Sequence, residues 1–298
     1  MIKKFRPVFT TEALVLAGAL IVTLPLRTVQ YYTNIEAGNG FYKSIDAITI
    51  IYAAILVAAS VFFLVTGIRK RKTVTLEMRP QRFPACGVFA FLSAFAIGYS
   101  AYSDWMLKDK DATEYIVSST ASASISGYLS IIQLVFGGIA ALYFLFLAVT
   151  FLMGKSSSLL KLTSLSVPIW VVLRLIMRFT RTISYLRVSD LALEMITLVL
   201  LASFFMAFVQ MNTGVESKGN EWKIPGFGFP AALFALNLFI PRLALIITGR
   251  AESMYILSTA DFSDLTLALF IVSTILTRMV PNITKVEVKG TETEETAE

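Results

Sequence analysis

Apolar residues in this chain come in long blocks, each close in length to a membrane-spanning helix. A helix needs about 20 apolar residues to cross the roughly 30 Å hydrocarbon core of a bilayer, where backbone groups find partners only within the helix. The blocks therefore predict an all-α, polytopic transmembrane helical bundle of about eight spans. The predicted spans are residues 8–28, 45–68, 84–106, 128–153, 159–185, 191–211, 229–249 and 264–279.

Charge is scarce and unevenly placed. Charged residues make up 15% of the chain, against about 25% in a soluble domain. Most of the 26 lysines and arginines fall on the side that holds the N-terminus, which predicts both termini in the cytoplasm. The basic N-terminal residues precede an apolar stretch without a small-residue cleavage pattern, so a retained first helix is expected rather than a signal peptide.

The chain divides into a single transmembrane helical domain, residues 1–285, and a short acidic tail, residues 286–298, which we expect to be disordered and cytoplasmic. The net charge of +6 is accounted for by membrane topology, so no nucleic-acid partner is expected. The densest basic run, residues 69–72, suits an anchor that attracts anionic membrane lipid. Alternatively, it is a docking site for a membrane or cytoplasmic partner protein.

Several catalytic chemistries are excluded by residue content. The chain has no histidine and one cysteine, Cys86, and contains no phosphate-binding GxxxxGK[ST] motif. Zinc-dependent HExxH sites, histidine-assisted nucleophiles and nucleotide hydrolysis therefore cannot be built here. We expect no enzyme and no cofactor, with carboxylate catalysis by Asp190, Glu194 or Asp264 as the one route left open.

Three arginines interrupt the fifth predicted span. Arg174, Arg178 and Arg181 are spaced i, i+4, i+7, so all three side chains project from one face of a helix. A charge near the bilayer centre costs at least about 2.5 kcal/mol on insertion scales, so these groups should meet carboxylates or water. Asp190 and Glu194, spaced i, i+4 at the start of the sixth span, are expected to face this arginine stripe across a short hairpin.

A second set of charges lies at a similar depth. Asp261 and Asp264, at the start of the eighth span, are expected beside Arg242 and Arg250. The rise of a helix places Arg174, Arg242 and Asp264 roughly 20 Å above the cytoplasmic face, so the charges share a layer in the outer third of the membrane. The candidate site residues are Arg174, Arg178, Arg181, Arg242, Glu194, Asp264 and Asp190.

Two interpretations of this charged layer remain open. The charges form interhelical salt bridges that fix the packing of a membrane scaffold or accessory subunit. Alternatively, they line an outward-facing pocket that binds or transports a small anionic or zwitterionic solute, because the guanidinium fork of arginine suits carboxylate and phosphate. A voltage sensor fits poorly, since only three arginines occupy the helix.

Prolines and glycines cluster in the seventh span. Proline is common in membrane helices, so a kink is the default interpretation. Alternatively, IPGFGFP at residues 224–230, followed by Asn237 and Pro241, breaks the helix near the charged layer, as in the discontinuous helices of transporters. The sixth and eighth spans also begin with similar sequences, SDLALEM at Ser189 and SDLTLAL at Ser263. The second span begins in a similar way, with SIDAITI at Ser44. These similarities indicate a bundle built from repeated helical hairpins.

The first hairpin, LPLRTVQYYTNIEAGNGFYKSIDAI, resembles the opening of uncharacterised multi-spanning membrane proteins of anaerobic low-GC Gram-positive bacteria. In those proteins the first helix ends in arginine followed by glutamine, and an acidic, glycine-containing loop leads to the second helix. The resemblance implies a bacterial inner membrane and no known activity. The matching positions are Arg27, Gln30, Glu36, Gly38, Gly40, Phe41 and Tyr42.

Overall fold

The computed structural model describes residues 8–36, 41–76, 82–114, 120–154, 161, 163–180, 189–213, 220–250 and 260–281, and most of these are helical. The all-α class predicted from the sequence is confirmed. The helices are α1 (Thr10–Thr33), α2 (Ala47–Lys70), α3 (Pro84–Glu114), α4 (Thr120–Met153), α6 (Ser166–Thr180), α7 (Ser189–Thr213), α8 (Lys223–Ile247) and α9 (Phe262–Arg278), and two short strands are β1 (Val74–Leu76) and β2 (Met279–Pro281). The predicted acidic tail lies outside the described residues.

Six of these helices are long and apolar enough to cross a membrane, namely α1, α2, α3, α4, α7 and α8. Their length and composition support a multi-pass membrane protein. Within the described residues, the fifth and eighth predicted spans correspond to shorter helices, α6 with 15 residues and α9 with 17. At about 1.5 Å per residue, the described parts of these two helices are roughly 22 and 25 Å long, less than the thickness of the hydrocarbon core.

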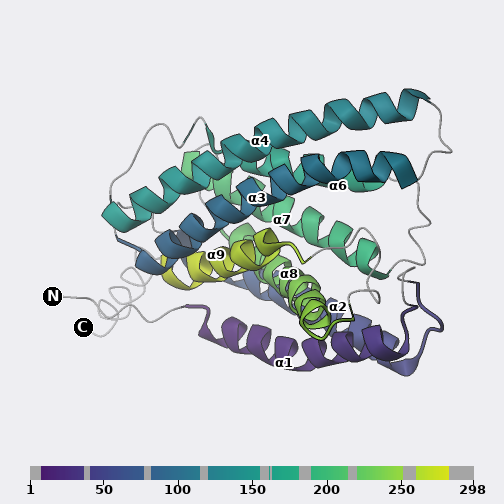
Figure 1. Cartoon of the computed structure of the whole chain (residues 1–298). Helices are drawn as coiled ribbons and strands as arrows, with labels where there is room; N and C mark the ends of the chain where they lie inside the picture. Colours follow the sequence, from purple (N-terminus) through teal and green to yellow (C-terminus); the bar gives the residue numbers. More distant parts are fainter. Residues whose placement is uncertain are drawn as a thin grey trace, which may run out of the picture.

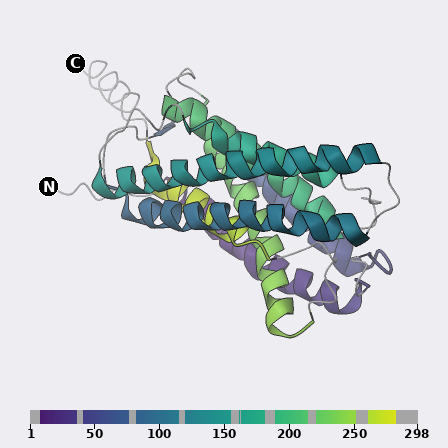
Figure 2. The same ribbon diagram turned by 45° about the horizontal axis from the view of Figure 1, so that its top comes forward.

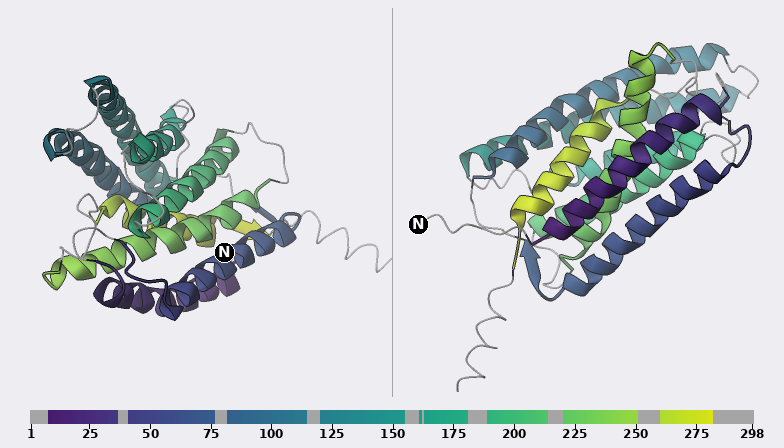
Figure 3. Two further views of the ribbon diagram at one scale, coloured as in Figure 1. Left: turned by 90° about the vertical axis from the view of Figure 1, so that its right-hand side faces the viewer. Right: turned by 90° about the horizontal axis from the view of Figure 1, so that it is seen from below.

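The helices pack in layers around α8. Figure 1 shows α3 and α4 along one side of the bundle and α1 and α2 along the opposite side, with α7, α8 and α9 between them. The views in Figures 2 and 3 show the same order, with α3 and α4 running side by side. α8 contacts α1, α2, α7 and α9, and most of its side chains are buried. It therefore forms the centre of the bundle.

This central helix is unbroken. α8 runs continuously through both Pro230 and Pro241. Each proline removes one backbone hydrogen bond, but neighbouring helices can hold a proline-containing segment in place within a membrane bundle. The seventh span is therefore continuous, and the alternative of a broken helix is wrong.

The glycines near the start of α8 have a packing role instead. A Cβ atom on Gly67 of α2 would lie 3.1 Å from the Cα atom of Gly226, and one on Gly228 would lie 2.8 Å from Ile275 of α9. Small residues at such contacts let helix backbones approach closely. The glycine-rich stretch brings α2, α8 and α9 together rather than interrupting α8.

One end of the bundle is fastened by polar contacts. β1 pairs antiparallel with β2, which joins the segment after α2 to the end of α9. Lys70, from the basic run at the end of α2, lies 2.7 Å from the buried carboxylate of Glu12 and donates to the carbonyl oxygen of Val8 at 3.0 Å. At least one lysine of the basic run therefore ties α2 to α1.

Candidate functional site

The buried charges at the opposite end form two groups. We call Arg27, Asp190, Arg242 and Glu194 the closed cluster, because all four side chains are buried between α1, α7 and α8. The pocket cluster consists of Arg174 and the groups around it on α3, α4, α6 and the start of α9. It adjoins a small opening in the protein. Arg178 connects the two clusters.

Asp190 is the centre of the closed cluster. It lies in the first turn of α7 and accepts hydrogen bonds from Arg27 Nη2 at 2.5 Å and from the hydroxyl of Tyr31. Its other oxygen, Oδ2, lies 3.7 Å from Arg242 Nε. Asp190 is 2% exposed and Arg27 is 0% exposed, so this carboxylate joins α1, α7 and α8 away from solvent.

Arg27 is held by further contacts. Its Nη1 donates to Gln30 Oε1 at 2.9 Å and to the hydroxyl of Tyr42 at 3.0 Å. Its guanidinium carbon lies 4.7 Å from the centre of the Tyr31 ring, a distance at which the ring face attracts a cation. Polar and aromatic partners thus replace the water that Arg27 loses on burial.

A line of alternating charges continues toward α6. Arg242 Nη2 lies 3.8 Å from Glu194 Oε2, and Glu194 Oε1 accepts from Arg178 Nε at 2.8 Å. Because Asp190 and Glu194 are one turn apart on α7, both carboxylates can reach Arg242 on α8. The line therefore links α1, α7, α8 and α6.

Arg174 is the centre of the pocket cluster. Its Nη2 lies 2.8 Å from Asp261 Oδ2, and its Nη1 donates to Ser263 Oγ at 3.1 Å and lies 3.8 Å from Asp264 Oδ1. The guanidinium carbon also lies 5.1 Å from the ring centre of Trp170. These contacts dock the start of α9 against the middle of α6.

Asp261 has three roles at this junction. It is the N-cap of α9, where its Oδ1 accepts from the backbone N–H of Ser263 at 2.8 Å. Its Oδ2 accepts from Ser100 Oγ on α3 at 2.6 Å and also pairs with Arg174. One carboxylate therefore connects α3, α6 and α9.

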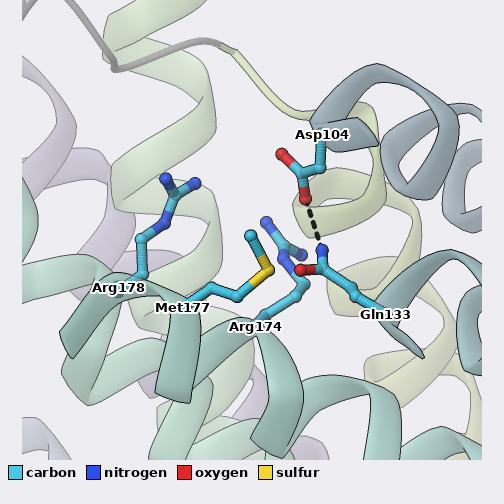
Figure 4. A pocket seen from close by; sticks show the side chains of 5 residues that line it. All are labelled: Asp104, Gln133, Arg174, Met177 and Arg178. Carbon is cyan, nitrogen blue, oxygen red and sulfur yellow. Dashed lines mark hydrogen bonds between the residues drawn. The ribbon is translucent and has the colours of Figure 1, made fainter. Parts of the chain in front are cut away.

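A pocket lies beside Arg174, between α3, α4 and α6 (Figure 4), and its empty volume of about 190 Å³ includes the open space at its mouth. Gln133 Nε2 donates to Asp104 Oδ2 across it at 2.6 Å. Within the described part of the chain, Gln133 Oε1 and Arg174 Nε are buried and have no hydrogen-bond partner. The pocket is lined by Asp104, Gln133, Arg174, Met177 and Arg178.

The structure confirms some of the predicted neighbours and corrects others. Glu194 faces the arginine stripe, where it meets Arg178. Asp190 was expected on the same stripe but pairs with Arg27 and Arg242, because the first turn of α7 points toward α1 and α8. Arg181 lies outside the described residues.

The carboxylates at the start of α9 are also paired differently from the expectation. Asp261 and Asp264 were expected beside Arg242 and Arg250, but their ion pairs within the described residues are with Arg174. The reason is that α9 packs between α3 and α8, which directs its first turn toward α6. The charges predicted to share a layer therefore do form ion pairs, but Asp261 and Asp264 pair with Arg174, and Arg242 pairs with Asp190.

The sequence reasoning missed part of the site. Gln133 was not singled out, although it is the single amide in the apolar stretch of α4, and that isolation is a signal. No partner was predicted for Arg27 or Asp104. Among the described residues, no group of three or more histidine, cysteine, aspartate or glutamate side chains is arranged to hold a metal ion.

The fold and these clusters define a multi-pass α-helical membrane protein with a buried network of arginine–carboxylate pairs. Comparison with known proteins adds no narrower class, since no family model, curated protein or solved structure matches the chain significantly. The function must therefore be argued from the two clusters.

Proposed function

We propose that this protein binds a small anionic or zwitterionic solute, for transport or sensing, in the pocket beside Arg174. The observation that carries the proposal is the pair of arginines, Arg174 and Arg178, on the wall of a pocket that also contains unsatisfied polar atoms. A buried polar atom without a partner costs about 1–3 kcal/mol, so a bound polar group would recover free energy here. The proposal requires binding and no catalytic step.

The membrane arrangement of this proposal has eight spans, with α6 and α9 as short crossing helices and both termini in the cytoplasm of a bacterial cell. The positive-inside bias supports that orientation. Two cross-pairings support repeated helical hairpins. Arg174 of the α6–α7 hairpin meets Asp264 of α9, and Arg242 of the α8–α9 hairpin meets Asp190 of α7.

A membrane scaffold or accessory subunit is the second candidate. Two observations favour it. Arg174, Arg178 and Arg242 each have a carboxylate oxygen within 4.0 Å. The pocket is also small, with a cavity volume of about 10 Å³, about the space that one water molecule needs. In this alternative every pair serves packing and no solute binds.

Thermal unfolding of the purified protein with and without small solutes separates the two candidates. Wild type, Arg174→Gln and Arg250→Gln are each heated with acetate, phosphate or glycine. Arg250 is the matched control, because it is an exposed arginine over Tyr32 outside the pocket. A solute at ten times its Kd stabilises the protein by about 1.4 kcal/mol.

Under the proposal, at least one of these solutes raises the unfolding temperature of wild type and of Arg250→Gln but not of Arg174→Gln. If none of the three solutes shifts wild type, and Arg174→Gln only unfolds at a lower temperature, the scaffold alternative is correct. The proposed function is then rejected.

A further inference from the structure

The buried charges of the two clusters are unequal in number when the pocket is included. Among the described residues, four arginines face five carboxylates. A simple anion in the pocket would add a further negative charge to this excess. The arginines are Arg27, Arg174, Arg178 and Arg242, and the carboxylates are Asp104, Asp190, Glu194, Asp261 and Asp264.

Asp104 differs from the other four carboxylates of the two clusters. It has no ion pair among the described residues, whereas each of the other four carboxylates has an arginine nitrogen within 4.0 Å. Its one side-chain hydrogen bond in the described part of the chain comes from Gln133 Nε2 at 2.6 Å. Asp104 is half-buried on the pocket wall, so its negative charge is accessible to a bound group.

The orientation of the Gln133 amide follows from that bond. A carboxylate only accepts hydrogen bonds, so the NH₂ group of Gln133 must face Asp104 and the carbonyl oxygen must face away from it. This oxygen, Oε1, is buried without a donor in the described residues, and Gln133 is 2% exposed. Among the described residues, the pocket therefore holds one carboxylate without an ion pair and one carbonyl oxygen without a donor. Figure 4 shows the Arg174 guanidinium next to the Gln133 amide and Arg178 on the other side of Met177.

We infer that the pocket binds a zwitterion of the amino-acid type, with its ammonium group at Asp104 and Gln133 Oε1 and its carboxylate at Arg174 and Arg178. This inference rests on the proposed function and narrows it to one class of solute. An ammonium group has three donors and one positive charge, which match the unpaired carboxylate and the unsatisfied carbonyl. Arg174 Nε, which has no acceptor in the described residues, is a donor for the solute carboxylate.

Three matched probes test the inference on the full-length protein at constant ionic strength. L-Alanine carries both charged groups, propionate lacks the ammonium group, and ethylamine lacks the carboxylate. Each is titrated against wild type while thermal unfolding is followed. Removing a charge-assisted hydrogen bond costs about 1.5–3 kcal/mol, so L-alanine should bind at least about tenfold more tightly than either analogue.

Two variants assign the ammonium group to Asp104. Asp104→Asn keeps an oxygen that can accept the hydrogen bond from Gln133 but removes the negative charge. The affinity for L-alanine should therefore fall about tenfold or more, whereas the affinity for propionate should not fall. Asp46→Asn is the matched control, because Asp46 is exposed at the start of α2 and is bonded by Ser44 outside the pocket. It should bind L-alanine as wild type does.

The outcomes distinguish this inference from the proposed function. If propionate binds wild type as tightly as L-alanine, and Asp104→Asn changes neither affinity, the ammonium subsite is wrong while solute binding stands. If ethylamine binds as tightly as L-alanine, the arginines do not hold the solute carboxylate and both statements are overturned. If no probe binds wild type, and acetate, phosphate and glycine do not either, the proposed function fails and this inference fails with it.

Discussion

The closed cluster and the pocket cluster both contain buried arginine–carboxylate pairs, but they differ in their surroundings. In the closed cluster, Asp190 pairs with Arg27 and receives a second hydrogen bond from Tyr31, deep between three helices. In the pocket cluster, Arg174 is equally buried and equally paired, but it borders an opening with polar atoms that have no partner in the described residues. Ion pairing alone therefore does not tell a packing site from a binding site in this protein.

The difference lies in access to an opening, because buried oxygen atoms without a hydrogen bond in the described residues occur in both clusters, Asp190 Oδ2 in one and Gln133 Oε1 in the other. A buried pair that no opening reaches can fix the register of helices, and a ligand cannot enter there. A pair that leaves donors and acceptors unused beside an opening can hold a ligand without being broken. Substitutions in the two clusters should therefore differ in their balance of stability loss and ligand loss.

The largest expected effect is that of Asp190→Asn in the closed cluster. The substitution leaves Arg27 and Arg242 buried without their shared carboxylate, which should lower the free energy of unfolding by about 3–5 kcal/mol. Denaturant unfolding of the protein in detergent micelles measures the change. Asp46→Asn, at an exposed aspartate, is the control and should change stability by less than about 0.5 kcal/mol. A loss below about 1 kcal/mol for Asp190→Asn would show that this cluster does not hold the helices together.

Arg174→Gln should have the next largest effect on stability. Asp261 keeps its hydrogen bonds from Ser100 and from the backbone of Ser263, so only part of its stabilisation is lost. We expect a decrease of about 2–4 kcal/mol in the free energy of unfolding, below the loss for Asp190→Asn. Reversal of that order, measured by the same denaturant unfolding, would contradict the distinction between the clusters.

Gly137→Ala tests the packing that supports the pocket. A Cβ atom at Gly137 of α4 would lie 2.5 Å from Ala101 of α3 and 3.0 Å from Trp170 Nε1, the ring beneath Arg174. The overlap should force α4 away from its neighbours at a cost of about 1–3 kcal/mol. Gly138→Ala is the matched control, because nothing lies within 4 Å of its Cβ position. Equal stability of the two variants would mean that α4 does not pack tightly at this level.

The helical class and one ion pair of the site could be predicted because they depend on local periodicity. Long apolar blocks specify helices in a bilayer, and six of the predicted spans correspond to helices long enough to cross one. The i, i+4 spacing of the arginines and of the acids on α7 was sufficient to place Arg178 opposite Glu194. In both cases the residues that matter are on one helix or on two consecutive helices.

The other pairings could not be predicted because they depend on which distant helices become neighbours. Arg27 and Asp190 are 163 residues apart, and nothing in either local sequence specifies that α1 packs near α7. The same applies to Arg174 and Asp261, 87 residues apart. The sequence left both a kinked and a broken α8 open for a related reason, since the effect of its prolines depends on the helices that surround α8 rather than on α8 alone.

The smallest expected stability effect, that of Asp104→Asn, gives the sharpest comparison. The substitution is the same as at Asp190, from aspartate to asparagine. Asp104, however, has no ion pair in the described residues, and the oxygen of an asparagine can still accept the hydrogen bond from Gln133. The free energy of unfolding should therefore change by less than about 0.5 kcal/mol without ligand. Denaturant unfolding beside Asp190→Asn checks the contrast. A loss comparable to that of Asp190→Asn would mean that Asp104 is a structural charge, and the pocket cluster would then be a second packing site.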